Sequence, residues 1–199
     1  MKKFLFVLVL GLLVLSSGFA KKVYLSFGDY NYIVDGEYYG GVSFDFEKLY
    51  SEPDSNFHSM TTSRFTCFLY ESDNSDFDRA FRFMVNAGYL FGYSKNVTDM
   101  LNLRIGGGID FRAGCFFYDY PNEVEKALTQ FGMDAVATAR ASFNFNQFSI
   151  MADAGLRYPM IESGLESYSS PGYDYDDDYT RSFDSDLIYT LSLSARLGF

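Results

Sequence analysis

Apolar and polar residues alternate along several long stretches of the chain. In the last eleven residues, 189–199, every second residue is apolar, and the residues between them are small or polar. The same period of two recurs in seven earlier stretches, residues 23–28, 39–48, 60–70, 81–92, 101–113, 131–143 and 148–158. Successive side chains of a β-strand point to opposite faces, so the pattern predicts eight strands, each with one apolar and one polar face.

Polar segments that contain turn-forming residues separate the predicted strands. The two longest are residues 117–129 and 159–183, and the shortest is the turn at residues 144–147. We expect residues 121–128 to form one or two helical turns, and we expect the acidic, Tyr-rich segment 173–179 to belong to an exposed loop. Short turns and longer loops alternate along the chain, as they do in up-and-down barrels that cross a membrane.

The length of the strands fits a membrane. A tilted strand needs about 9–11 residues to cross the hydrocarbon core, and the terminal stretch has eleven. After residue 20, the sequence contains no run of eighteen apolar residues that could form a membrane-spanning helix. Phe and Tyr make up 20% of the chain, and aromatic residues favour strands. We therefore predict an all-β fold, an eight-stranded antiparallel transmembrane up-and-down β-barrel.

Apart from Lys48 at a strand end, the charged side chains in the predicted strands lie on the polar face, and Asp186, just before the last strand, shares that parity. The set comprises seven arginines and six carboxylates: Arg64, Arg82, Arg104, Arg112, Arg140, Arg157 and Arg196, with Asp45, Glu47, Asp110, Asp134, Asp153 and Asp186. An arginine facing lipid costs about 2–4 kcal/mol at the membrane midplane, so we expect this face to line the barrel interior. The interior of an eight-stranded barrel is only just wide enough for side chains. We therefore interpret these residues as a structural network of ion pairs that fills the lumen.

A soluble barrel of the lipocalin kind is the main alternative, because it also has eight strands. Its polarity would be the opposite, with apolar side chains inside and charged ones outside. In this chain the charged residues share their parity with many glycines, including Gly41, Gly106 and Gly155, whereas the other face carries large Phe and Leu side chains. Small residues and ion pairs suit a narrow interior, so the membrane barrel is favoured.

The N-terminus has the features of a secretory signal peptide. Two lysines precede twelve apolar residues at positions 4–15, and Gly18 and Ala20 offer small residues at the cleavage positions. We expect residues 1–20 to be removed and residues 21–199 to form one barrel domain. Without Lys2 and Lys3, 14 of the 16 Lys and Arg residues remain against 26 Asp and Glu, a formal charge of −12. Such an acidic domain lacks the basic patch that nucleic-acid binding requires.

In pattern, length and C-terminal strand, the chain resembles the small bacterial outer-membrane β-barrels of the OmpA, OmpX and OmpW type. The resemblance implies an outer-membrane location, contact with membrane lipid, and a monomer with both termini and the short turns on the periplasmic side. In that family the C-terminal strand ends in Phe and serves as the signal for the barrel-assembly machinery. The matching residues here are Tyr189, Leu191, Leu193, Leu197 and Phe199.

Candidate chemistry in the sequence is sparse. The glycine-rich run 106–114 lies inside a predicted strand and opens no helix, unlike a nucleotide-binding loop. The acidic run 174–178 offers carboxylates that Ca²⁺ prefers, but it lacks a recognised ligand spacing and fits a solvated loop. Some barrels of the resembling group are lipid-modifying enzymes with a His near the outer leaflet, whereas His58 lies in the first inner turn. We expect no catalytic residues, metal or cofactor.

The function predicted is that of a non-enzymatic outer-membrane barrel that displays acidic, Tyr-rich loops, with a role in envelope integrity or surface interaction and an unidentified surface partner. One alternative is a small pore for ions or for hydrophobic compounds that leave sideways through the wall. The other alternative is a lipid-modifying enzyme. The state of the lumen distinguishes the non-enzymatic barrel from the pore, because a closed network of charged side chains blocks the passage of ions.

Two cysteines, Cys67 and Cys115, raise the question of a disulfide in an exported chain. They fall on the apolar parity of the third and fifth predicted strands, with one strand between them. Two strand spacings separate such Cα atoms by about 9–10 Å, and a disulfide requires about 7 Å or less. We therefore expect two free thiols.

Overall fold

The computed structural model describes residues 22–34, 37–51, 55–70, 79–120, 124–170, 173–182 and 187–199. These residues form nine strands: β1 (Lys22–Val34), β2 (Glu37–Ser51), β3 (Phe57–Tyr70), β4 (Arg79–Asn96), β5 (Leu101–Tyr120), β6 (Val124–Phe145), β7 (Phe148–Ser170), β8 (Tyr173–Ser182) and β9 (Ile188–Gly198). Among them, no helix is long and apolar enough to span a membrane. The signal-peptide expectation for residues 1–20 lies outside the described residues.

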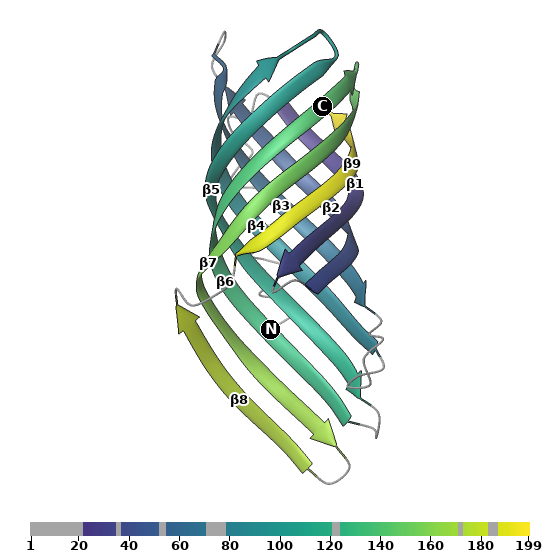
Figure 1. The fold of residues 1–199 in the computed structure, drawn as a ribbon, viewed down its shortest axis with the longest axis vertical. Helices are drawn as coiled ribbons and strands as arrows, with labels where there is room; N and C mark the ends of the chain where they lie inside the picture. The colour runs from purple at the N-terminus through teal and green to yellow at the C-terminus, as the bar shows by residue number, and fades with distance from the viewer. Residues whose placement is uncertain are drawn as a thin grey trace.

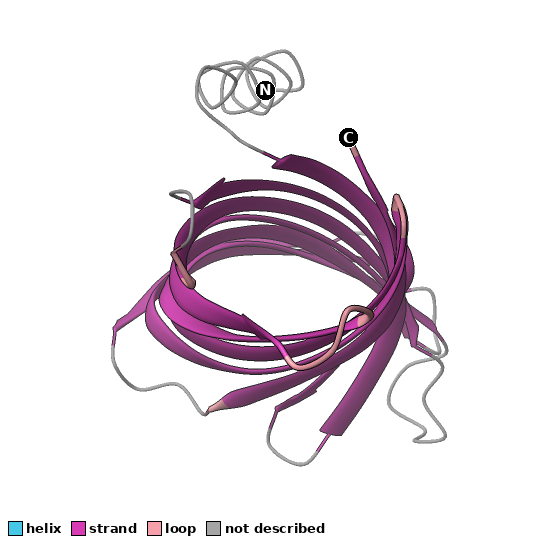
Figure 2. Ribbon diagram, turned by 90° about the horizontal axis from the view of Figure 1, so that it is seen from above, coloured by secondary structure: helices cyan, strands magenta, loops and turns pink. Residues whose placement is uncertain are grey.

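Eight of the nine strands close into a barrel. Strands β1 to β7 pair antiparallel in chain order, and β9 completes the ring by pairing with both β7 and β1. Figure 2 shows the closed ring along the barrel axis. The eight-stranded antiparallel barrel predicted from the sequence is therefore confirmed.

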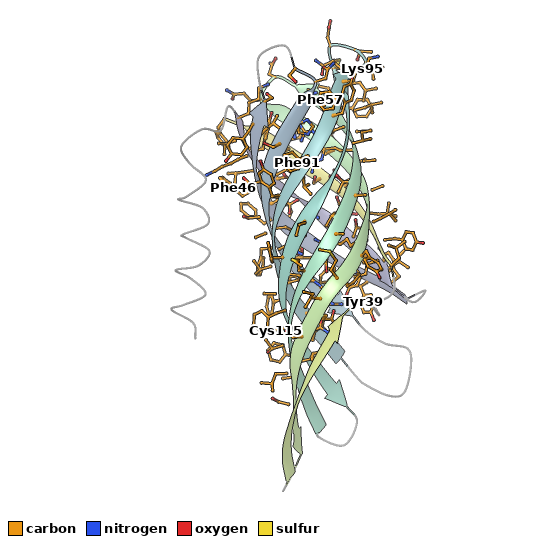
Figure 3. The ribbon with its side chains drawn as sticks, turned by 90° about the vertical axis from the view of Figure 1, so that its left-hand side faces the viewer. Tyr39, Phe46, Phe57, Phe91, Lys95 and Cys115 are labelled. Atoms are coloured by element: carbon orange, nitrogen blue, oxygen red, sulfur yellow. The ribbon has the colours of Figure 1, made fainter. Side chains whose placement is uncertain are left out.

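One end of the barrel has short connections, and we call it the short-turn end. It carries the C-terminus and the two-residue turn between β6 and β7. Asn146 in that turn has a φ of 56°, a left-handed conformation that Asn adopts more readily than most residues. Phe57, Phe91 and Lys95 lie toward the short-turn end, and Cys115 lies farther along the wall (Figure 3).

At the opposite end, several strands continue past the ring, and we call it the extended end. β5 runs to Tyr120 and β6 begins at Val124, so the helical turns expected within residues 121–128 are wrong for the described part, 124–128. The loop expected at 159–183 is also wrong: β7 continues to Ser170, and β8 pairs with its outer half. Outside a membrane, both faces of a sheet can meet water. A strand there needs no apolar face, so strand pairing can continue beyond the point where the apolar alternation of the sequence ends.

β7 changes its pairing partner at Pro159. Up to Arg157 it pairs with β9, and from Ile161 it pairs with β8. On its other side, Met133 of β6 pairs with Ile161 while the next residue pairs with Pro159, so Met160 is an extra residue in the ladder. A proline donates no backbone hydrogen bond and is found at such irregular positions. The bulge reverses the parity of β7 beyond this point.

The two faces of the wall have the polarity that a membrane requires. On the outer face, large apolar side chains are exposed, for example Phe27 and Ile105 at 61% and Leu193 at 57%. On the inner face, charged side chains are buried, for example Glu47 at 1% and Asp134 at 0%. This is the reverse of a lipocalin-like barrel, so the soluble alternative does not fit the structure.

Candidate functional site

The lumen is filled by layers of ion pairs that link strands across the barrel. Nearest the short-turn end, the Glu47 carboxylate of β2 accepts two hydrogen bonds from Arg140 of β6, at 2.6 and 2.7 Å. Arg140 also pairs with Asp153 of β7, and Arg196 Nη1 of β9 lies 3.8 Å from Glu47 Oε2. A two-bond contact between a guanidinium and a carboxylate is strong and geometrically specific.

A second layer lies closer to the extended end. Arg112 Nη2 of β5 donates to Glu162 Oε2 of β7 at 2.8 Å and lies 3.5 Å from Asp134 Oδ1 of β6. Arg157 pairs with Asp110, and its Nε lies 3.6 Å from Asp134 Oδ2. The two arginines share Asp134, so this layer is one connected network.

A third pair lies on the adjacent part of the wall. Arg64 of β3 donates from Nε and Nη2 to the two oxygens of Asp45 on β2, at 2.7 and 2.9 Å. Its guanidinium also stacks over the Tyr30 ring, 4.4 Å from the centroid. Hydrogen bonding and ring stacking together hold the Arg64 side chain flat against β1 and β2.

Two arginines of the predicted set are held differently. Arg82 lies among aromatic rings, with its guanidinium carbon 3.7 Å from the Phe116 centroid and 4.6 Å from that of Tyr32. Arg104 is buried at the short-turn end and donates to Met60 Sδ at 3.4 Å. Asp186, the remaining member of the predicted set, lies outside the described residues.

Apolar side chains cluster toward both ends of the lumen. At the extended end, a buried cluster is formed by Tyr30, Tyr32, Phe68, Met84 and Ile188. At the short-turn end, Leu49, Met60 and Leu90 pack together with the half-buried Tyr24 and Val136. Between the two clusters lies a polar cavity of about 70 Å³.

Sequence periodicity alone missed Glu162, because residues beyond 158 were interpreted as a loop. The extra residue Met160 turns Glu162 inward, where it binds Arg112 and accepts from Gln130 Nε2 at 3.2 Å. Pro159 is the residue from which the sequence could have indicated this change of parity, because proline within a sheet is confined to edge strands, strand starts and bulges. The aromatic cluster around Arg82 was also missed, because its members come from several strands.

The other candidates are placed as follows. His58 is buried at the short-turn end, where its ring lies against Gly92 of β4. Cys67 and Cys115 are free thiols, half-buried on the outer face, and both lie opposite Phe83 in their ladders. In the described part of the chain, no three His, Cys, Asp or Glu side chains gather as metal ligands would. The side chains of residues 173–182 are not described.

No family model matches the sequence, and no curated protein shows significant sequence similarity to it. Solved structures are similar in fold. A major outer membrane protein from Thermus thermophilus is 12% identical with a TM-score of 0.59, over 89% of this chain and 99% of that one. Neisserial surface protein A is 10% identical with a TM-score of 0.53, over 89% and 96% of the two chains.

The closed eight-stranded ring, its apolar outer wall and its charged interior define an outer-membrane-type β-barrel. More particularly, the chain has the fold of the small outer-membrane barrels to which these two proteins belong.

Proposed function

We propose that the protein is a non-enzymatic outer-membrane barrel that presents its extended sheet as an interaction surface at the cell exterior. In barrels of this class the termini and short turns face the periplasm, which puts the extended end outside. Residues 1–20 act as the export signal in this proposal. The barrel-assembly machinery recognises β9, whose outer face carries Tyr189, Leu191, Leu193 and Leu197, together with Phe199, the residue after the strand.

The observation that carries the proposal is the extension of the sheet beyond the ring. β8 hydrogen-bonds to the outer half of β7 along one edge, and no described strand pairs with its other edge. A free strand edge offers a row of backbone donors and acceptors to an added strand. In Figure 1, β8 projects from the lower left of the barrel, below the start of β9.

Charge indicates the kind of partner. β8 has the sequence Tyr-Asp-Tyr-Asp-Asp-Asp-Tyr-Thr-Arg-Ser, with four Asp against one Arg. A basic, extended peptide segment would meet complementary charge and a strand edge at the same place. A role in envelope integrity requires no such partner. Binding of a peptide by β8 would therefore favour the surface-interaction role over the envelope-integrity role.

The filled lumen weighs against the pore alternative. Ion pairs join β2, β3, β5, β6, β7 and β9 across the interior, and apolar clusters lie toward both ends. The position of His58 weighs against an enzyme of the lipid-modifying kind, because this residue lies at the short-turn end.

The experiment uses cells that display the full-length chain and a fluorescent ten-residue peptide of alternating Lys and Thr as the probe. Replacing Asp174, Asp176, Asp177 and Asp178 by Asn should weaken binding at least tenfold at low salt, and Tyr175→Pro should weaken it by interrupting the free edge. Asp99→Asn, in the short turn after β4, is the matched control and should change nothing. Equal binding by all variants would contradict the proposal.

A further inference from the structure

The ladder that closes the barrel, between β1 and β9, is interrupted. Its pairs run from Tyr24 and Gly198 to Gly28 and Ser194, and they resume at Asn31 and Leu191. The two pairs expected in between, Asp29 with Leu193 and Tyr30 with Ser192, are missing. The ladders from β1 through β6 have no such gap in the part of the chain that the structure describes.

The hydrogen bonding between the two strands changes at this point. Up to Gly28 and Ser194 the residues pair as in a regular ladder. One residue farther along, the Leu193 amide donates to the Asp29 side chain instead of to the backbone of β1. A carboxylate thus stands where a backbone carbonyl would normally accept.

Asp29 lies on the outer face of β1, between the apolar Phe27 and the polar Asn31. Its neighbours there are Phe27 on the same strand and Val42 on β2, both exposed. The second oxygen of Asp29 accepts from Asn31 Nδ2 at 3.1 Å, and Asn31 Oδ1 accepts from the Tyr38 hydroxyl at 2.7 Å. An ionisable group within the membrane-crossing wall is costly and commonly marks a functional position.

The polar cavity lies directly behind the interruption. Its lining includes Tyr30, Thr190 and Ser192, the inward residues of the two strands at this height. Ser192 Oγ donates to Asp153 Oδ2 at 3.4 Å. Polar groups therefore lie on both sides of the interruption: Tyr38, Asn31 and Asp29 on the outer face, and Ser192 and Asp153 inside.

The cavity is built to take hydrogen-bonding solutes. Four buried atoms in its lining have no hydrogen-bond partner: Asn86 Oδ1, Arg104 Nε, Asp110 Oδ1 and Arg157 Nε. Buried polar atoms of this kind are usually satisfied by solvent. A water needs about 10–15 Å³ of such space, so a cavity of about 70 Å³ holds several.

We infer that the seam between β1 and β9 is a lateral entrance to this cavity for water and water-sized hydrogen-bonding solutes. Buried apolar clusters lie in the lumen on either side of the cavity, whereas at the seam a bond between the Leu193 amide and the Asp29 carboxylate replaces the backbone pairing. Entry is therefore sideways, through the wall. This inference does not depend on the interaction surface at β8.

The test uses Ag⁺, a thiol-reactive ion of about the size of water, and the full mature chain in lipid vesicles. In a Cys67→Ala, Cys115→Ala background, Ser192→Cys places a reporter thiol in the cavity. A disulfide between Phe27→Cys and Ala195→Cys locks the seam, because these residues are directly paired on the outer face. The matched control lock joins Val85→Cys and Ala113→Cys, a directly paired position on β4 and β5.

The reporter should react with Ag⁺ in the unlocked protein and in the control lock, and the seam lock should slow the reaction at least tenfold. Equal rates with both locks would mean axial entry, and no reaction without a lock would mean a sealed cavity; either result overturns the inference. Amide hydrogen exchange of the unmodified protein gives a second readout. Residues 28–32 and 190–194 should exchange faster than residues 83–87 and 111–115, and equal exchange would also overturn the inference.

Discussion

Glu47 and Arg140 lie across the barrel from each other, 93 residues apart in sequence, and join β2 to β6 by two hydrogen bonds. These two strands lie on opposite sides of the ring, because three strands stand between them in either direction. Both side chains are buried, so each protects the other from the cost of an unpaired charge. The pair acts as a strut that sets the width of the lumen near the short-turn end.

Removing one member of this strut should destabilise the barrel strongly. Glu47→Gln leaves Arg140 and Arg196 without their shared carboxylate, and we expect a loss of about 3–5 kcal/mol in the free energy of unfolding. Urea unfolding in lipid vesicles, followed by circular dichroism, measures it. Lys95→Gln, an exposed charge at the short-turn end, is the control and should change stability by less than about 0.5 kcal/mol.

The coupling between the two residues can be measured by a double-mutant cycle. Glu47→Met combined with Arg140→Met should cost less than the sum of the two single changes, because the second change removes the charge that the first left unpaired. Additivity within about 0.5 kcal/mol would mean that the two side chains do not interact energetically.

The filled lumen predicts little conductance. Refolded protein in planar bilayers should give only small, brief currents, because ion pairs and two apolar clusters occupy the axial path. Phe68→Ala opens the cluster at the extended end only, so it should leave conductance low. Large, stable channels in the unmodified protein would favour the pore alternative instead.

The cost of a charge on the outer wall should depend on depth. Ile109 is exposed near the middle of the apolar part of β5, whereas Leu103 lies near its start, paired with Lys95. Ile109→Arg should make the free energy of folding in vesicles less favourable by about 2–4 kcal/mol, and Leu103→Arg by about 0–1 kcal/mol. The yield of folded protein should fall accordingly. Thr138→Asn, on the inner face, should fold as the unmodified protein does. Equal yields for the two arginine variants would contradict the assigned depth.

Within the membrane, the sequence was sufficient to predict the strands, because lipid on one side and a narrow interior on the other impose strict alternation. The alternation fails at Asp29, which lies on the apolar parity of β1, and the sequence predicts a first strand that runs to Gly28 or somewhat beyond. The ladder with β2 nevertheless continues to Val34. Asp29, which breaks the apolar alternation, is also the residue at which the pairing between β1 and β9 is interrupted.

Outside the membrane, the alternation gave no information about the sheet. β8 carries charge on both parities because both of its faces can meet water, so its sequence resembles a loop. Glu162 was missed for a related reason, since one extra residue, Met160, reverses the parity that an uninterrupted strand would have. The ion-pair partners also had to come from the structure, because residues that share a parity can pair in many ways.

The two thiols provide a simple check of the strand order. Cys67 and Cys115 both lie opposite Phe83, one in the β3–β4 ladder and one in the β4–β5 ladder. Mass spectrometry of the unreduced protein should find both as free thiols. A water-soluble maleimide should label Cys115, nearer the extended end, faster than Cys67. A crosslink within one molecule would require a different arrangement of β3 to β5.

β7 is 23 residues long, and at about 3.4 Å per residue it is more than twice as long as the roughly 30 Å thickness of the hydrocarbon core. Its first half is bonded to β9 and its second half to β8, with no linker between the halves. β7 therefore connects β8 directly to the barrel wall. A pull on β8 would be transmitted along one continuous strand, past the bulge at Met160, to β9, the strand that closes the barrel.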